Sequence, residues 1–263
     1  MAEDGRGGLG WGEAFGCRME HQRGRPHGHA VIRSFSALFG KRILSITGLE
    51  NIGIDRDPFI LALNHSQHLE ALFVPATLGI FRCGKMIRFI ADWNLQLVPG
   101  IWPVYRAGQV IILDRKPAKP AWLNILRPLL TTRMPASERA ARLIDEGHSI
   151  GIFPEGTTNR DPKRLLRGFY GAAQLSLTKG APVVPGGIRF PGHEGDGPIA
   201  GNEPMEIEIG KAMPPPGVSE KPKRKDLLAF HAAIMQEISR LSGKSWQADS
   251  SRRKPCLAQK IST

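Results

Sequence analysis

The sequence predicts an α/β fold, with a single domain whose mostly parallel or mixed central sheet is flanked by helices. Two observations favour this class. Short apolar runs bounded by turn residues alternate with stretches whose apolar residues recur at helical spacing. The chain has 263 residues, 41% hydrophobic and 23% charged, which is the composition of a chain that buries a core. Wholesale disorder is therefore excluded.

Six apolar runs are expected to be strands. Five are nearly continuous in apolar residues, whereas the last alternates with Glu206 and Glu208 and should have one face in water. In chain order, the runs are Phe59 to Leu63, Ile87 to Ala91, Val110 to Leu113, Ile150 to Phe153, Pro182 to Phe190, and Met205 to Ile209.

Helices are expected between these strands and after them. One begins after the strand Phe59 to Leu63, and another spans Ser137 to Glu146, with Ser137 as its N-cap. A third is expected from about Arg164 to Lys179. A fourth, from about Asp226 to Leu241, carries apolar residues at helical spacing.

The composition and the predicted elements divide the chain into four parts. Residues 1–29, rich in Gly, Arg and His, are expected to be a flexible leader, and residues 30–215 the main domain. Residues 216–245 should form a C-terminal helix packed on that domain, and residues 246–263 a basic flexible tail. Whether Met1 or Met19 is the true start stays open. The main domain begins with a basic amphipathic segment, formed by Arg33, Phe35, Leu38, Phe39, Lys41, Arg42, Ile43 and Leu44.

The net charge of +12 indicates a polyanionic partner, which could be nucleic acid, an anionic membrane or a phosphorylated ligand. Most of the excess falls on residues 82–189 and 211–263. No nucleic-acid-binding module is recognisable, so we expect no nucleic-acid partner. No apolar stretch reaches the roughly 20 residues of a membrane-spanning helix, and no secretory signal is evident. The three cysteines have no zinc-like spacing and suggest no disulfide framework.

Chemistry-bearing residues follow several of the expected strands. His65 comes just after the first, and Glu70 lies about one helical turn further on, where a carboxylate can orient an imidazole that acts as a base. Taken alone, this pair is a weak signal and is more typical of an ordinary polar helix start at the surface. A metal site formed by His65, His68 and Glu70 is a weaker alternative, because no further ligand cluster is evident nearby.

Arg115 ends the strand Val110 to Leu113 and is suited to bidentate contact with a phosphate, although a structural salt bridge is an equal alternative. The turn Glu155-Gly156-Thr157, after the strand Ile150 to Phe153, offers backbone N–H groups and a carboxylate to a polar ligand. In Ala181 to Gly186 two prolines bracket a short apolar strand, which would otherwise be interpreted as an edge strand.

These four motifs, in this order, resemble those of the glycerolipid acyltransferase superfamily, of which lysophosphatidate acyltransferase is the familiar member. The resemblance spans about residues 43–212, and Phe153-Pro154-Glu155-Gly156-Thr157 is its most specific part. It implies that His65 is the catalytic base and that Glu70 occupies the position of the family's aspartate. It also implies acceptor or phosphate binding by Arg115, Glu155, Gly156, Thr157 and Arg160, and acyl-chain or donor binding by Pro185.

Three departures from the family pattern are visible. Glu70 is one methylene longer than aspartate, and Gly108 lies one residue too far from Arg115 for the second motif. Thr158 stands where the family usually has arginine. The last two departures weaken the case for a simple phosphate monoester as acceptor.

The resemblance implies an O-acyltransferase of phospholipid biosynthesis that needs no cofactor and no metal. His65 would deprotonate the hydroxyl of a lysolipid, 1-acyl-glycerol-3-phosphate, as it attacks the thioester of acyl-CoA or acyl-carrier protein, without an acyl-enzyme. The expected location is the cytoplasmic side of an anionic membrane, peripheral or monotopic. Two alternatives stay open: an acceptor without phosphate, such as an aminolipid or glycolipid, and a catalytically weakened lipid-binding protein.

Overall fold

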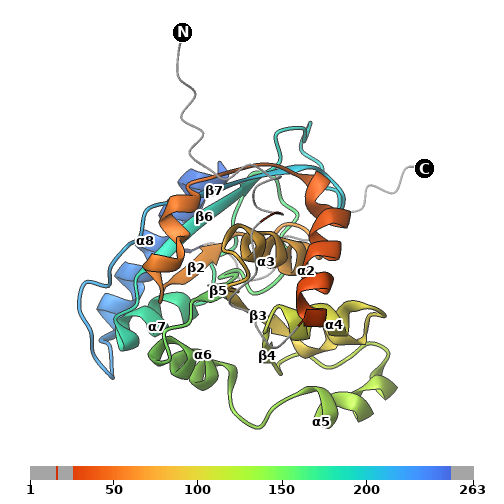
Figure 1. The fold of residues 1–263 in the computed structure, drawn as a ribbon. Coiled ribbons are helices and arrows are strands. Elements are labelled where there is room, and N and C mark those ends of the chain that lie inside the picture. The colour runs from red at the N-terminus through yellow and green to blue at the C-terminus, as the bar shows by residue number, and fades with distance from the viewer. Residues whose placement is uncertain (1–15, 17–25, 250–263) are drawn as a thin grey trace.

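The centre of the molecule is a seven-stranded sheet in the order β1-β7-β6-β2-β5-β3-β4 (Figure 1). The structure, a computed structural model, describes Gly16 and residues 26–249. The strands are β1 Ile43–Thr47, β2 Ile60–Leu63, β3 Arg88–Asp92, β4 Ile111–Leu113, β5 Ile150–Ile152, β6 Val183–Arg189 and β7 Met205–Ile209.

Neighbouring strands are parallel everywhere except between β6 and β7. Ala62 of β2 lies opposite Ile152 of β5 on one side and Pro185 of β6 on the other. The carboxyl ends of β2, β3, β4, β5 and β6 therefore meet at one edge of the sheet. In open α/β sheets this is the edge at which ligand sites form.

Helices cover both faces of the sheet. The cluster that contains Ile60 and Ala62 packs under α6, α7 and α8, whereas Leu61 and Leu63 face α2 and α3. The α-helices are α2 Pro26–Phe39, α3 Glu70–Phe81, α4 Ile101–Ala107, α5 Arg127–Leu130, α6 Ala136–Asp145, α7 Gly171–Lys179 and α8 Arg224–Ser242. Short 3-10 helices are η2 Gly40–Arg42, η3 Leu49–Ile52, η4 Ile54–Arg56, η5 Trp93–Leu97 and η6 Ala121–Leu126.

The predicted fold class is confirmed, and all six predicted strands form with ends shifted by at most one residue. The alternating strand is β7, in which Met205, Ile207 and Ile209 are buried while Glu206 and Glu208 are partly exposed. Its bounds coincide with those predicted.

Three helices differ from the prediction at their start, and one of them, α8, begins at Arg224 instead of Asp226. α7 begins only at Gly171, because the backbone before it is held elsewhere: the N–H of Leu165 donates to the Ser245 carbonyl and that of Leu166 to the Glu155 carboxylate. α6 begins at Ala136, so Ser137 lies inside the first turn and caps nothing.

One strand was not predicted. β1 pairs in parallel with β7 at the edge of the sheet, and it buries Ile43 while Leu44 stays exposed. Ile43 and Leu44 directly follow the basic residues Lys41 and Arg42, so the sequence pattern indicated an amphipathic segment there and not a strand. Cys83 is disulfide-bonded, although the cysteine spacing suggested no disulfide.

The predicted leader and tail lie largely outside the described residues. α2 begins at Pro26, four residues before the predicted domain start. At the other end, α8 packs on β6 and Trp246 packs against the core beneath it.

A buried ion cluster ties the start of β2 to the end of α3. The Asp57 carboxylate accepts hydrogen bonds from Arg82 at 2.6 and 2.7 Å and also contacts Lys85 and Ser149. Burial raises the pKa of Asp57, but the bonds from Arg82, Lys85 and Ser149 outweigh it and hold that pKa below its ordinary value of 3.8. The ionised form is therefore stabilised by folding.

Asp57→Asn is expected to lower the free energy of unfolding by about 3 kcal/mol, because it leaves the Arg82 guanidinium, 2% exposed, without its counter-charge. In the native chain this contribution is present above the unfolded pKa and is lost as pH falls below 3.8 through the folded value. Urea denaturation at neutral and acid pH measures both effects. Glu146→Gln, which breaks the exposed pair with Arg142, is the control and should cost under about 1 kcal/mol.

Candidate active site

His65 and Glu70 form a buried pair at the carboxyl end of β2. His65 follows the strand by two residues, and Glu70 is the first residue of α3. The imidazole Nδ1 lies 2.9 Å from Glu70 Oε2, and the same oxygen accepts the Ser66 N–H at 2.7 Å. The Glu70 side chain is fully buried, and that of His65 is 11% exposed. A proton on Nδ1 satisfies this contact, so Nε2 is left to accept a proton from a substrate.

The glutamate in place of aspartate does not break the pair. Because Glu70 begins α3, its carboxylate lies at the positive end of the helix, where negative charge is stabilised. The longer side chain folds back along the turn and reaches both the imidazole and the Ser66 amide. The extra methylene is thus accommodated by the local backbone.

A second buried carboxylate, that of Glu155, fixes the backbone at His65. Glu155 Oε1 accepts the His65 N–H at 3.2 Å, while Oε2 accepts from Asn159 Nδ2 at 2.7 Å and from the Leu166 N–H at 2.8 Å. The Asn159 N–H in turn donates to the His65 carbonyl at 2.7 Å. The loop after β5 therefore holds His65 through both its backbone N–H and its backbone carbonyl.

Lys244 supplies a buried positive charge behind the pair. Its ammonium donates to Ser66 Oγ and to the Asp161 carbonyl, each at 2.8 Å. Burial lowers the pKa of Lys244, and the charges of Glu155 and Glu70 oppose that shift. Burial raises the pKa of Glu155, against bonds from the Leu166 and His65 amides and from Asn159 and the charge of Lys244. The cation thus offsets part of the cost of two buried carboxylates.

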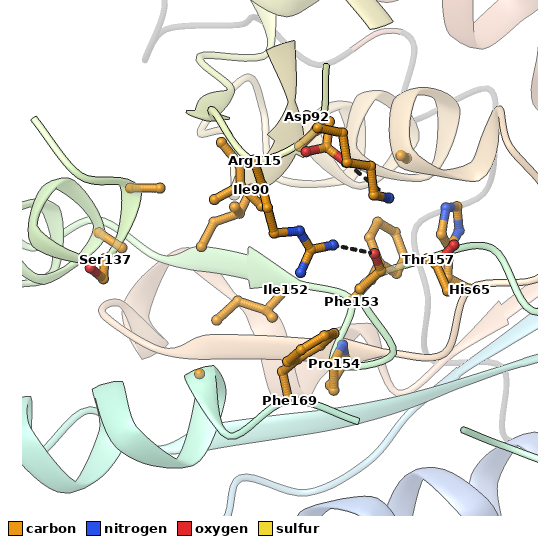
Figure 2. A pocket seen from close by; sticks show the side chains of 18 of the residues that line it. His65, Ile90, Asp92, Arg115, Ser137, Ile152, Phe153, Pro154, Thr157 and Phe169 are labelled. Atoms are coloured by element: carbon orange, nitrogen blue, oxygen red, sulfur yellow. Dashed lines mark hydrogen bonds and ion pairs between the residues drawn. The ribbon is translucent and has the colours of Figure 1, made fainter. Parts of the chain in front are cut away.

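A cavity of about 740 Å³ opens beside His65 (Figure 2). It lies on the sheet face covered by α6 and α7, and Figure 2 shows His65 at one end, Ser137 at the other and Arg115 between them. The surface of the cavity wall is mostly apolar. Its apolar side chains are those of Ala71, Ile90, Ala91, Leu95, Leu113, Ala136, Ala140, Ala141, Ile152, Phe153, Pro154, Phe169 and Leu175. A long apolar group can therefore lie along the sheet with one end near the imidazole.

Arg115 reaches into the middle of this cavity from the end of β4. Its guanidinium donates to the Gly156 carbonyl at 3.0 Å and lies over the Phe169 ring, 5.1 Å from the centroid. Lys116 also lines the cavity and pairs with Asp92 at 3.2 Å. Both cations are partly exposed, so an anionic group in the cavity can reach them.

Thr158, which stands where the family usually has arginine, lies beside Nε2 of His65, the ring nitrogen that does not contact Glu70. Its hydroxyl is 3.3 Å from His65 Nε2 and 3.1 Å from Nδ1 of His68. The hydroxyl occupies the side of the imidazole that a substrate hydroxyl must approach. An acceptor therefore has to share or displace this contact.

The structure brings part of the predicted site together. His65, Arg115, Gly156 and Thr157 line one cavity, with Glu70 directly behind the histidine. The other three predicted residues do not line it: Glu155 is directed at the His65 loop, Arg160 donates to the Ile199 carbonyl, and Pro185 is buried within β6.

Sequence reasoning missed several residues of the site. Lys116 directly follows Arg115, so its place could have been inferred from that motif. Phe169 and the wall residues of α6 and α7 belong to no motif. Lys244 lies 178 residues from Ser66 along the chain, and no local pattern connects the two.

The fold and the site together describe an α/β protein in which a histidine bonded to a buried carboxylate lies at one end of a largely apolar cavity. Residues 43–189 match the Acyltransferase family, and this match spans more than half of the chain. The chain therefore belongs to the Acyltransferase family and is an acyltransferase, which confirms the class expected from the motifs.

Relatives with named activities are distant. The chain is 26% identical over 215 residues to the 1-acyl-sn-glycerol-3-phosphate acyltransferase of Bacillus subtilis, an alignment that covers 78% of this chain and 94% of that protein. It is 29% identical over 157 residues to the protein of the same name from Borreliella burgdorferi, covering 59% of this chain and 54% of that one.

The fold is that of a solved member of the family. The crystal structure of the 1-acyl-sn-glycerophosphate acyltransferase PlsC from Thermotoga maritima superposes with a TM-score of 0.52. It is 22% identical, and the match covers 84% of this chain and 83% of that chain.

Two further features are not found among the described residues. None of the helices within residues 26–249 combines the length and apolar character required to cross a bilayer. In the same part of the chain, no three His, Cys, Asp or Glu side chains gather where they could hold a metal ion.

Proposed function

We propose that this acyltransferase moves a fatty acyl group from an acyl thioester to the free hydroxyl of a phosphate-bearing lysolipid, 1-acyl-glycerol-3-phosphate. The observation that carries the proposal is the His65–Glu70 pair at the end of an apolar cavity that also holds Arg115. The names of the relatives from Bacillus subtilis and Borreliella burgdorferi support the same acceptor. The reaction belongs to phospholipid biosynthesis.

The chemistry follows from the two nitrogens of His65. Nδ1 is held by Glu70, so Nε2 takes the proton of the acceptor hydroxyl as its oxygen attacks the thioester carbonyl. Glu70 then balances the positive charge that forms on the ring. When the tetrahedral intermediate collapses, the thiolate leaves and recovers the proton from Nε2. No acyl-enzyme is needed, since the acceptor itself is the nucleophile.

The phosphate head group and the acyl chain are bound by different parts of the site. A phosphate head group is held by Arg115, with Lys116 as a second cation, which places the neighbouring hydroxyl near His65. The apolar wall along β3, β5, α6 and α7 takes an acyl chain. The donor is acyl-CoA or acyl-carrier protein, both of which present the same thioester.

Three predicted residues take supporting roles in this proposal. Glu155 positions the His65 backbone rather than touching the acceptor, because its oxygens already accept three hydrogen bonds. Arg160 holds the loop around Ile199, and Pro185 stiffens β6 beside β2. We further propose that the enzyme works at the cytoplasmic surface of an anionic membrane, where lysolipid substrates reside.

An acceptor without phosphate is the second candidate, and one observation favours it. Thr158 takes the place of a cation and Arg160 lies outside the cavity wall, so Arg115 and Lys116 are the cations that line the cavity. A glycolipid or aminolipid acceptor would need fewer positive charges.

Arg115→Ala distinguishes the two acceptors. If the head group is a phosphate, kcat/KM for lysophosphatidate should fall about 10- to 100-fold, mainly through KM, because a charge-assisted hydrogen bond is lost. Transfer to an uncharged monoacylglycerol should change little. The experiment is a steady-state assay of both acceptors with acyl-CoA.

Arg160→Ala is the matched comparison, since it removes the other predicted cation. Its effect on KM should be smaller because its side chain is engaged by Ile199 outside the cavity. Equal losses with charged and uncharged acceptors in Arg115→Ala would contradict the phosphate assignment.

A further inference from the structure

The most exposed apolar side chains lie between β4 and α6. Leu129 is 81% exposed, Ile125 78% and Trp122 71%, and they are three of the four most exposed large apolar side chains among residues 26–249. Isolated apolar residues on a surface need no explanation, whereas a group of bulky ones indicates an interaction site.

These three side chains belong to one short helical stretch. Trp122 and Ile125 lie three residues apart on η6, and Leu129 follows four residues later on α5. Residues three and four apart share a side of a helix. We call Trp122, Ile125 and Leu129 the apolar ridge.

The segment that carries the ridge begins and ends at the active-site cavity. Lys116 and Ala136, which flank the segment that carries it, both line the cavity. On the inner side, Gln96 Nε2 donates to the Leu130 carbonyl at 3.2 Å, and η5 packs on both α5 and α4. Figure 1 shows α5 at the periphery of the molecule, on the same side as α4 and β4.

Basic residues outnumber acidic ones in the segment that carries the ridge. Residues 115–137 contain five Lys or Arg residues and no Asp or Glu. Among the described residues, Lys119 and Arg133 form no ion pair, whereas Arg127 is paired with Asp114. Exposed Trp and aliphatic side chains in a segment that also carries exposed, unpaired basic residues are typical of an element that lies in the interface of an anionic bilayer.

We propose that the apolar ridge inserts into the interfacial layer of an anionic phospholipid bilayer and holds the active-site cavity close to that surface. This inference rests on the proposed function, because it specifies how a lipid acceptor reaches His65. A lysolipid could then pass from the bilayer into the cavity beside Lys116 without exposing its chain to water. The three side chains of the ridge project outward, each at least 71% exposed, which suits insertion into a deformable lipid surface.

Vesicle sedimentation with the full chain tests the ridge independently of catalysis. Vesicles of phosphatidylcholine mixed with phosphatidylglycerol should bind the native protein, and added salt should weaken the binding. The triple variant Trp122→Ser, Ile125→Ser and Leu129→Ser should bind at least about tenfold more weakly, because three large apolar groups are removed from the lipid phase. Thermal melting checks that the variant is folded, which is expected because all three side chains are exposed.

The double variant Leu38→Ser and Leu44→Ser is the matched control. These side chains, 72% and 54% exposed, belong to the amphipathic segment of α2 and β1 and not to the ridge. Their replacement should leave vesicle binding within about twofold of the native value. Native binding by the triple variant, or loss of binding only in the double variant, would overturn the proposal.

Two activity readouts separate this inference from the proposed function. The triple variant should transfer acyl groups normally to a short-chain, water-soluble lysolipid and poorly to a lysolipid embedded in vesicles. If no variant or native protein transfers acyl groups, the proposed function fails while vesicle binding still tests the ridge. If the triple variant binds vesicles normally but loses transfer from acyl-carrier protein alone, the ridge is a protein-docking surface and the lipid assignment is wrong.

Discussion

His65→Gln is expected to lower turnover in acyl transfer by about a hundred- to ten-thousandfold, which is the usual contribution of a general base. Glutamine keeps the approximate size of the side chain but cannot take a proton from the acceptor. KM should change less than kcat, because the binding groups around Arg115 stay in place. Steady-state assays with acyl-CoA and lysophosphatidate measure both constants.

The matched control is His148→Gln, because His148 lies before β5 and does not line the cavity. It should keep native turnover. The His65 variant should also melt close to the native temperature, since its backbone is held through amide contacts with Glu155 and Asn159 that the substitution leaves intact. Near-native turnover in folded His65→Gln would refute its role as the base.

Glu70→Gln is expected to have the second largest effect, a loss of turnover on the order of a thousandfold. The glutamine amide occupies the same space but carries no negative charge, so the protonated imidazole is no longer stabilised. Glu70→Asp keeps the charge and only shortens the side chain, and it should retain far more activity than Glu70→Gln. Comparing the turnover of the two variants separates the effect of the Glu70 charge from the effect of its side-chain length.

A stability measurement accompanies this pair of variants. The Glu70 side chain is fully buried and accepts the Ser66 N–H as well as the imidazole, so both variants should lose some stability. Assays below the melting temperature of the weaker variant keep the comparison valid. If Glu70→Asp is as inactive as folded Glu70→Gln, the carboxylate acts through its exact position and not mainly through its charge.

The convergence of several predicted site residues could be expected because these residues follow strand ends. Parallel strands bring their carboxyl ends to one edge, so His65 after β2, Arg115 after β4 and Gly156 after β5 converge although they lie far apart in the sequence. The order of the motifs along the chain was therefore sufficient for these positions.

The direction of each side chain could not be predicted in the same way. Glu155 and Gly156 are neighbours in one motif, yet Gly156 lines the cavity while the Glu155 carboxylate is directed at the His65 amide. The turn that separates them is set by the contacts of Asn159 and Leu166, which are tertiary. A motif places a loop at the site but does not say which side chains face the ligand.

Long-range contacts explain the remaining differences. Lys244 follows α8 and reaches the catalytic loop only because that helix packs on β6. The residues before α7 have helical spacing in the sequence but bond to Glu155 and Ser245, and these contacts override local propensity. Local sequence patterns do not predict contacts of this kind, because they form only when the chain folds.

Formation of phosphatidate by the purified chain tests the central claim most directly. Acyl-CoA or acyl-carrier protein charged with a labelled fatty acid is supplied with lysophosphatidate in vesicles, and the lipid products are identified by mass spectrometry. We predict labelled phosphatidate with the native chain and a loss of at least about a hundredfold with His65→Gln. Absence of acyl transfer from either donor, or equal product from the folded His65 variant, would contradict the account.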